Sequence, residues 1–488
     1  MVFSSLQPAS VWRHFSTLCA IPRASGHEEA LRAALAAWAH ERGLGVKTDA
    51  VGNLILSRPA SAGYDDRPGV VLQGHLDMVC QKNGASAHNF ARDPIHAEVR
   101  DGWVVAPDTT LGADNGIGVA LALAALEADD IEHPALEVLL TVDEETGMGG
   151  ARGLHAEALS GRLLLNLDTE EWGEVYLGCA GSADVLINAE FPTEPRSVAE
   201  VAGWQAVSLR LTGLVGGHSG IDIHRQRGNA IKLLARVLHG LTQRGVEFRL
   251  AGLNGGTARN ALPREAEAVL LVADLERLRE AGAALVALLR EELSGVDDGL
   301  RVDILPAPLP ATLLHRVAAR NVIALLHALP QGVRRLSNTL PGVVDTSNNV
   351  GVLRLDEGRL SVDIMVRSLR DAGVHALSAE IVDLCALGGI HARITAPAPG
   401  WTPNPDSALL ALVKDVYRQN SGGEATTQVI HAGLECGLFA ALWPEMDIVS
   451  FGPTIHGAHA PGERVEIASV EKAWRLLTGV LAAIPPRS

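Results

Sequence analysis

Carboxylates and histidines follow several apolar runs of this chain in short clusters. The tetrapeptide GHLD at 74–77 comes directly after one apolar run, DEE at 143–145 after a second, and Asp168 after a third. Asp114 opens a strongly helical segment, and His459 follows a late apolar run. Any one of these clusters could cap a helix or form a solvated turn. Several carboxylates gathered at one place, however, repel one another and raise one another's pKa values unless a cation compensates for their charge.

The residue types in these clusters predict the kind of cation. Carboxylates with imidazoles suit zinc, manganese or cobalt, and the absence of cysteine from the set argues against a structural zinc site. Two histidines and four or five carboxylates are enough for two metals that share a bridging carboxylate. Two metals about 3.5–4 Å apart can hold one hydroxide and polarise a carbonyl group. The neighbours Glu144 and Glu145 fit this chemistry, because one can bind metal while the other stays free as a general base.

The elements that must position these residues are the apolar runs before them. These runs are apolar throughout rather than alternating, which is typical of strands buried on both faces of a mainly parallel sheet. Open α/β sheets bind ligands beyond the carboxyl ends of their strands, and the acidic clusters follow the predicted strands there. Amphipathic helices are predicted over 10–20 and 27–42. The predicted strands are 70–73, 136–142, 163–167 and 175–177.

The character of the chain changes at about residue 185 to alternating strands and amphipathic helices. Inside this part, a weak internal duplication sets 257–260 beside 346–349 and would give two similar halves, with chance similarity between two α/β segments as the alternative. A proline-rich stretch over 397–405 predicts a linker. The parts after these divisions are 1–185, 186–399 and 400–488.

Composition and charge exclude several function classes. The 488 residues carry 41 lysines and arginines against 57 aspartates and glutamates, a formal net charge of -16, which argues against nucleic acid or an anionic membrane surface as a partner. The most apolar stretch, 117–126, is too short to span a bilayer. The five cysteines form no C-x-x-C pair, which favours a reducing compartment. Because the first residues lack the pattern of a secretory signal, a cytoplasmic protein of two or three domains is expected.

Longer motifs follow one another along the chain: GHLDMV, LGADNGIG, TVDEETGMGGA, LLNLDTEEWGEVYLGCAG, GGHSGIDIHRQRGNA and FGPTIHGAHAPGERV. As a set they resemble the aminoacyl-histidine dipeptidases (peptidase D type) of the two-zinc aminoacylase/carboxypeptidase superfamily of metallopeptidases. The resemblance runs from Ser25 to Trp474. It implies an α/β catalytic domain formed by 1–185 and 400–488, interrupted by an inserted α+β lid domain over 186–399. It also implies a small peptide substrate, a dipeptide with C-terminal histidine such as β-alanyl-histidine.

By this resemblance, five residues bind two divalent metal ions, with zinc expected and manganese or cobalt as alternatives. His75, Asp114 and Asp168 match the ligands of one metal, and Asp114, Glu145 and His459 match those of the other. Asp114 is then the bridging carboxylate. No ligand position of the family pattern is missing, which argues against a catalytically inactive homologue.

The resemblance also assigns two carboxylates beside the ligands. Asp77 matches the residue behind His75 that accepts the second ring N–H and fixes the tautomer. Glu144 matches the general base, which takes a proton from the bridging water and later delivers it to the leaving amine. The implied mechanism is attack by a hydroxide that bridges the two metals.

Five further residues match positions near the substrate. His218, in GGHSG, matches the lid histidine that hydrogen-bonds the developing oxyanion, although from the residues alone it could equally be a turn residue. Asn260 and Arg367 match lid positions that hold the substrate, Arg367 by a bidentate grip on its terminal carboxylate, with an ordinary surface arginine as the alternative. His431 and Glu435, in HAGLECG, are expected to line the pocket near the metals or else to have a structural role at a helix start.

Two other functions are compatible with the sequence. One is a related amidohydrolase of N-acyl amino acids, and the other is a non-catalytic metal- or peptide-binding homologue. The long lid with two similar halves favours the dipeptidase, because simpler relatives have one half and borrow the other from a partner subunit. Retention of Glu144 argues against a binding protein, since binding alone needs no free carboxylate. A homodimer is compatible with this interpretation and would then serve stability rather than complete the site.

Overall fold

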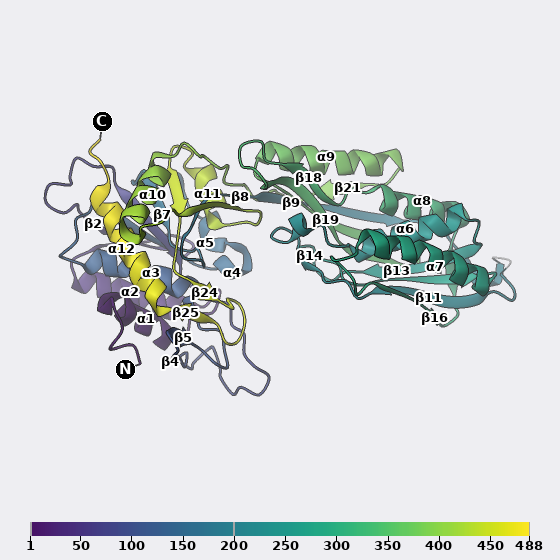
Figure 1. Cartoon of the computed structure of the whole chain (residues 1–488), viewed down its shortest axis with the longest axis horizontal. Coiled ribbons are helices and arrows are strands. Elements are labelled where there is room, and N and C mark those ends of the chain that lie inside the picture. Colours follow the sequence, from purple (N-terminus) through teal and green to yellow (C-terminus); the bar gives the residue numbers. More distant parts are fainter. Residues whose placement is uncertain (1, 199–200, 488) are drawn as a thin grey trace. The chain divides into compact units, whose positions relative to one another are not determined.

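Residues 2–198 and 201–487 are described by the structure, a computed structural model, and they form two compact units (Figure 1). The first unit runs to Gly178 and continues over Trp401–Val429 and from Leu434 onward. The second unit contains Cys179–Gly400 and the short stretch Ile430–Gly433. The second unit is therefore an insertion in the sequence of the first.

The first unit is built on a mixed sheet whose central strands are parallel. In order across the sheet, the strands are β1 (Gly45–Thr48), β2 (Leu54–Arg58), β6 (Leu136–Thr141), β3 (Val70–His75), β7 (Leu163–Asn166), β23 (Asp447–Ser450), β8 (Glu174–Cys179) and β22 (Thr426–Ile430). The neighbours from β6 to β23 run parallel, and every residue of β3 is buried. Strands covered on both faces need apolar side chains on both faces, which explains why these runs show no polar alternation.

The predicted α/β class is confirmed, and one strand differs from its predicted orientation. The run at 175–177 forms part of β8, which pairs antiparallel with β23. The loop 167–173 between β7 and β8 is short, whereas a parallel connection needs a dozen or more residues. Because β1 and β2 also pair antiparallel, parallel pairing is confined to the centre of the sheet.

Helices pack on this sheet and on one another. They are α1 (Ala9–Ala20), α2 (Glu29–Glu41), α3 (Ala113–Glu127), α10 (Ala408–Ser421), α11 (Glu435–Leu442) and α12 (Ile467–Ala483). α3 packs on β3 and α1 packs on α3, so residues 115–126 of α3 are all buried, as expected of a helix that is apolar all round. Within the described residues, no helix combines the length and apolar character needed to cross a bilayer.

A small antiparallel sheet joins segments from distant parts of the sequence. Its strands, in order, are β24 (Ile455–His456), β25 (Arg464–Glu466), β5 (Trp103–Val105) and β4 (Glu98–Arg100). Beyond the β25–β5 ladder, the backbone N–H of Gly462 donates to the carbonyl oxygens of Ala106 and Thr109. The loop that precedes α3 therefore lies against the loop between β24 and β25.

The second unit is an antiparallel sheet with helices packed on it in one hydrophobic core. The central strands are β13 (Phe248–Gly255) and β19 (Val344–Asp356). Outward from β13 follow β15 (Ala266–Val272), β11 (Gln205–Thr212) and β16 (Arg301–Pro306), and outward from β19 follow β20 (Arg359–Ser368), β9 (Gly181–Glu190) and β21 (Ala392–Ile394). The helices are α6 (Ala230–Gln243), α7 (Leu275–Glu292), α8 (Arg316–Ala328) and α9 (Asp371–Leu387).

The two sides of this sheet repeat one order of elements. On one side, β11, α6, β13, β15, α7 and β16 follow one another along the chain. On the other side, β9 comes first, and α8, β19, β20, α9 and β21 follow after the intervening first half. In both halves the second strand is central and the fourth is outermost. The short strand β18 (Gly332–Leu336) pairs with β19 outside this pattern.

Gly118 of α3 provides a test of how closely this helix packs. A Cβ at Gly118 would overlap the carbonyl oxygen of Leu167. Because a backbone atom cannot move aside as a flexible side chain can, Gly118→Ala is expected to lower the free energy of unfolding by about 1–3 kcal/mol. Urea unfolding followed by circular dichroism measures this change.

The matched control is Gly282→Ala in α7. A Cβ at Gly282 would have Ile304 Cδ1 as a neighbour at 3.9 Å, which is ordinary contact. This variant is expected to raise the free energy of unfolding by about 0.4–1 kcal/mol, because alanine restricts the unfolded chain. Equal stabilities of the two variants would contradict the packing described for α3.

Candidate metal centre

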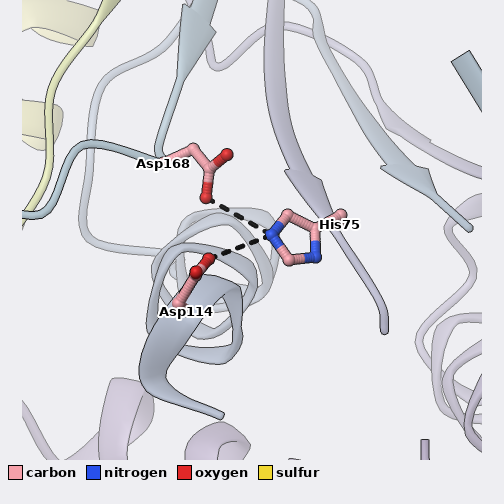
Figure 2. Close-up of side chains that lie close together, drawn as sticks. All are labelled: His75, Asp114 and Asp168. Carbon is pink, nitrogen blue, oxygen red and sulfur yellow. Dashed lines mark hydrogen bonds and ion pairs between the residues drawn. The ribbon is translucent and has the colours of Figure 1, made fainter. Parts of the chain in front are cut away.

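His75, Asp114 and Asp168 converge from different elements of the first unit (Figure 2). His75 is the last residue of β3, Asp114 lies in the first turn of α3, and Asp168 lies in the loop after β7. His75 Nε2 is 3.0 Å from Asp114 Oδ1 and 3.5 Å from Asp168 Oδ1. The two carboxylates therefore point at the same ring nitrogen, as Figure 2 shows.

A second group, formed by Asp114, Glu145 and His459, shares Asp114 with the first. Glu145 lies in the short helix α4 (Glu144–Gly147), and His459 lies in the loop between β24 and β25. His459 Nε2 is 3.0 Å from Asp114 Oδ2 and 3.1 Å from Glu145 Oε1. Each carboxylate oxygen of Asp114 thus faces a different imidazole. The His459 side chain is 53% exposed, so the centre is open to solvent on this side.

Asp77 holds three parts of this centre and is itself fully buried. Its carboxylate lies 3.4 Å from His75 Nδ1. The same carboxylate accepts the backbone N–H groups of Glu144 (3.0 Å) and Glu145 (3.1 Å), and Ser25 Oγ donates to it at 2.7 Å. Asp77 therefore lies behind the His75 ring and also fixes the segment that carries both glutamates.

Glu144 lies beside the ligand groups. The Glu144 carboxylate, His75 and Glu145 offer ligand atoms within 4.8 Å of one another. Burial raises the pKa of Glu144 well above its usual range, and the charge of Glu435 adds to this shift. Glu144 is thus a carboxylate whose backbone is fixed and whose side chain stands next to a candidate metal ligand.

Glu435, at the start of α11, ends a chain of buried hydrogen bonds. Its Oε2 accepts from Gln73 Nε2 at 2.6 Å and from Thr141 Oγ1 at 2.8 Å, and the Gln73 side chain accepts from Asn166 Nδ2. Since Thr141 pairs with His75 across β6 and β3, Glu435 lies close to that histidine. Its Oε1 is buried without a hydrogen-bond partner, and burial raises the pKa of the carboxyl group to about 7.

His218 lies in the second unit, in the short strand β12 (Gly217–His218), which pairs with β14 (Ala261–Leu262). His218 Nδ1 accepts the backbone N–H groups of Gly220 (3.2 Å) and Ile221 (3.0 Å). A ring nitrogen that accepts hydrogen bonds carries no proton, so the proton of the neutral ring is on Nε2. Burial lowers the pKa of His218, and the charge of a neighbouring arginine lowers it further.

Arg367 and His431 lie together in this same unit. Arg367 in β20 is opposite Ser347 in β19, and Ser347 Oγ is 2.8 Å from His431 Nε2. Gly220 lies against both residues, because a Cβ there would overlap the carbonyl oxygen of His431 and lie 3.2 Å from Arg367 Nε. His431 therefore belongs to the second unit, although the predicted division at residue 400 assigns it to the first domain.

The surface alternative for Arg367 is wrong, because the residue is only 6% exposed. Burial lowers the pKa of Arg367 to about 10. Burial, with the charge of Arg367, also lowers the pKa of His431 to about 3, so that this ring is neutral. Arg367 Nε and His431 Nδ1 are both buried without hydrogen-bond partners. Such unsatisfied buried groups are suited to a polar or anionic ligand.

Asn260 lies next to the His218 loop, since its backbone carbonyl accepts the N–H of Ser219 at 2.8 Å. The Asn260 side chain is exposed. The residues singled out from the sequence thus form one group in each unit. The first unit contains His75, Asp77, Asp114, Glu144, Glu145, Asp168, Glu435 and His459, and the second contains His218, Asn260, Arg367 and His431.

Comparison with known proteins agrees with this arrangement of residues. The model of peptidase family M20/M25/M40 matches residues 71–483. The chain belongs to this family. A cytosol non-specific dipeptidase from Escherichia coli K12, a relative of this M20 family member, is 43% identical over 486 residues, which cover 99% of both chains.

Solved structures of the family have the same fold. An aminoacylhistidine dipeptidase from Vibrio alginolyticus has 42% identity and a TM-score of 0.92, over 100% of this chain and 99% of that one. An aminopeptidase from Bacillus cereus, at 15% identity and a TM-score of 0.55, covers 98% of this chain and 99% of that one. The second likeness shows the fold alone.

Charge balance in this M20 peptidase fits divalent cations at the two groups. Burial raises the pKa of Asp168 to about 6, and Asp168 Oδ1 is buried without a hydrogen-bond partner. Burial opposes ionisation of Asp114, yet hydrogen bonds from His459 and His75 lower its pKa overall. Hydrogen bonds to Asp114 and Glu145 raise the pKa of His459 to about 11. Protonated imidazoles thus supply the positive charge that metal ions would supply, and imidazole nitrogens with carboxylate oxygens suit zinc, manganese or cobalt.

Three buried or half-buried residues of this family member support the centre without any signal in the sequence. Ser25 donates to Asp77, while Arg23 and Glu463 bind the backbone of the loop before α3. Glu463 stands in the same motif as His459, HAPGE, and this proximity was the one indication available. A side chain that binds backbone groups has no partner residue type that a sequence pattern could record.

Proposed function

We propose that this chain is a metal-dependent dipeptidase that cleaves dipeptides with a C-terminal histidine, such as β-alanyl-histidine, among its substrates. The observation that carries the proposal is the Asp114 carboxylate, whose oxygens each lie 3.0 Å from a different imidazole. The names of two relatives support the substrate class, since one is a non-specific dipeptidase and the other an aminoacylhistidine dipeptidase. By the same analogy with a cytosol dipeptidase, we propose a cytoplasmic location.

Two divalent ions, zinc by preference and manganese or cobalt otherwise, would be held by the five ligand residues with Asp114 between them. When bound, such ions activate a water molecule for attack and polarise the scissile carbonyl group. The ligands of the proposal are His75, Asp114 and Asp168 for one ion and Asp114, Glu145 and His459 for the other. The remaining steps belong to other side chains.

Glu144 is the proposed general base. Its backbone is fixed by Asp77, and its carboxylate is next to the proposed ligand Glu145. Glu144 takes one proton from the attacking water as the water oxygen bonds to the carbonyl carbon. It then gives this proton to the leaving nitrogen as the C–N bond breaks. One carboxylate therefore completes both proton transfers, while Asp77 orients the ring of His75.

His218 is the proposed donor to the oxyanion. Because its Nδ1 accepts the N–H groups of Gly220 and Ile221, its Nε2–H is available as a hydrogen-bond donor. A neutral donor held in a fixed orientation stabilises charge that develops on the carbonyl oxygen and needs no change of protonation. Its role is then electrostatic, and the proton transfers stay with Glu144.

Arg367 is the proposed binding residue for the free carboxylate of the dipeptide. A buried guanidinium with an unsatisfied nitrogen suits a bidentate pair with a carboxylate. We assign Asn260, His431 and Glu435 to substrate binding as well, the last two because each has one buried polar atom without a partner. Because His218 and Arg367 lie in the same unit of one chain, we propose that a homodimer is not needed to complete the site.

A substrate panel tests the proposed function. Protein loaded with zinc, manganese or cobalt is assayed on Ala-His, β-alanyl-histidine, dipeptides without histidine, and N-acetyl amino acids. Hydrolysis of the dipeptides, with histidine at the C-terminus accepted, is expected. Hydrolysis confined to N-acetyl amino acids would instead support the amidohydrolase, and binding without turnover would support a non-catalytic homologue.

Glu144→Gln is expected to remove catalysis while both metals stay bound. A general base contributes about 10²–10⁴-fold to the rate, and more when it serves two proton transfers. Turnover and metal content are measured on the same sample, with Glu145→Gln as the matched variant that should lose metal. If Glu144→Gln lost its metal together with its activity, the roles assigned to the two glutamates would be reversed.

Arg367→Lys is expected to lower kcat/KM on free dipeptides by about 10-fold to 100-fold, because a hydrogen bond to a charged group contributes about 1.5–3 kcal/mol and lysine offers a point contact in place of a fork. A C-terminally amidated dipeptide should be poor for the wild type and lose little more in the variant. Arg354→Lys is the control, since Arg354 of the same sheet binds the backbone carbonyls of Gly255 and Gly256. Equal losses on free and amidated substrates would exclude carboxylate recognition by Arg367.

A further inference from the structure

The loop Leu111–Asp114, which delivers the shared carboxylate, lies between two buried charges. Glu463 and Arg23 are each 2% exposed. Neither belongs to the ligand groups, and both bind backbone atoms of the loop. Buried charges are costly unless hydrogen bonds satisfy them, so the positions of these two side chains call for an explanation beyond packing.

Glu463 accepts consecutive backbone N–H groups of this loop. Its Oε2 accepts from Leu111 at 2.7 Å and Gly112 at 2.9 Å, and its Oε1 accepts from Ala113 at 2.7 Å and Asp114 at 3.2 Å. These donors include the first N–H groups of α3, which have no partner inside the helix. Glu463 follows closely after His459 in the loop that ends at β25. It therefore fixes the Asp114 backbone to the segment that carries His459.

Arg23 binds the opposite side of the same loop. Its Nη2 donates to the carbonyl oxygen of Gly112, while its Nη1 donates to the carbonyl oxygens of Leu76 (2.9 Å) and Asp77 (2.8 Å). Leu76 follows directly after His75 at the end of β3. Gly112 permits this approach, because a Cβ there would overlap Arg23 Nη2. Arg23 therefore fixes the Asp114 loop to the strand end that carries His75.

We infer that Arg23 and Glu463 are positioning residues that set the Asp114 carboxylate between His75 and His459 before any metal binds. The inference rests on the proposed two-metal function. The three ligands come from separate segments, and the two side chains are the bonds that bring those segments into register. Because Asp114 belongs to both ligand groups, a loosened loop should weaken both metals together.

Conservative variants should be enough to disturb this arrangement. Glutamine keeps the volume of Glu463 but places an NH₂ donor against backbone N–H donors, whereas a carboxylate is acceptor-only. Lysine at position 23 keeps the charge but replaces the planar fork, which reaches three carbonyl oxygens from two nitrogens, with a single ammonium group. Neither variant changes a proposed ligand.

Glu137→Gln is the matched control. Glu137 also accepts backbone N–H groups, from Ser160 at 2.9 Å and Gly161 at 2.7 Å. It is the second residue of β6, at the opposite end of that strand from the metal groups. The same chemical change is thereby made in the same unit, away from Asp114.

The test measures zinc affinity and fold stability separately. Metal-free wild type, Glu463→Gln, Arg23→Lys and Glu137→Gln are titrated with zinc in competition with a chromophoric chelator, and each metal-free protein is melted by circular dichroism. Glu463→Gln and Arg23→Lys are expected to bind both zinc ions about 10–100-fold more weakly, with metal-free proteins that are still folded. Glu137→Gln should bind zinc as the wild type does.

Three results would overturn the inference: unchanged zinc affinity in both variants, loss at one zinc site alone, or metal-free variants that are unfolded where the wild type is folded. The last result would show that the two charges stabilise the fold as a whole. Failure of the proposed function has a different signature, since a wild-type protein that binds none of zinc, manganese and cobalt would contradict the two-metal site itself.

Discussion

The position of one carboxylate, that of Asp114, determines how the first unit assembles its chemistry. Its oxygens are each 3.0 Å from an imidazole, one on His75 and one on His459. Parallel strands bring His75 and Asp168 to the same edge of the central sheet, and the small antiparallel sheet brings the His459 loop against the start of α3. Crowded carboxylates are stable in such a place only when positive charge is close. The fold therefore creates a demand for cations at the point where the strands end.

Ligand chemistry is what made the metal-binding residues predictable. Few residue types bind metals, and here they follow apolar runs that form buried strands, so GHLD, DEE and Asp168 could be assigned to one edge of a sheet. The orientation of β8 could not be predicted, because an apolar run has the same appearance in parallel and antiparallel strands. Arg23 and Glu463 escaped notice because their partners are backbone groups. Sequence patterns record side chains, and those contacts exist only once the loops have folded.

The second unit shows how burial changes what a residue can do. An exposed arginine at position 367 would be unremarkable, whereas the buried one has a guanidinium nitrogen without a partner and a lowered pKa. His218 was open to two interpretations, a turn residue or a catalytic one, and its two ring nitrogens accommodate both. Nδ1 accepts the N–H groups of the turn, and this contact leaves the Nε2–H as a donor. A structural hydrogen bond thus sets the tautomer that the proposed chemistry requires.

Anomalous X-ray diffraction from crystals of the zinc-loaded protein, recorded on both sides of the zinc absorption edge, tests the central claim most directly. A shared Asp114 carboxylate predicts two zinc peaks about 3.5–4 Å apart, one beside His75 and Asp168 and the other beside Glu145 and His459, with an Asp114 oxygen toward each. A single peak, or two peaks that do not share Asp114, would contradict the account.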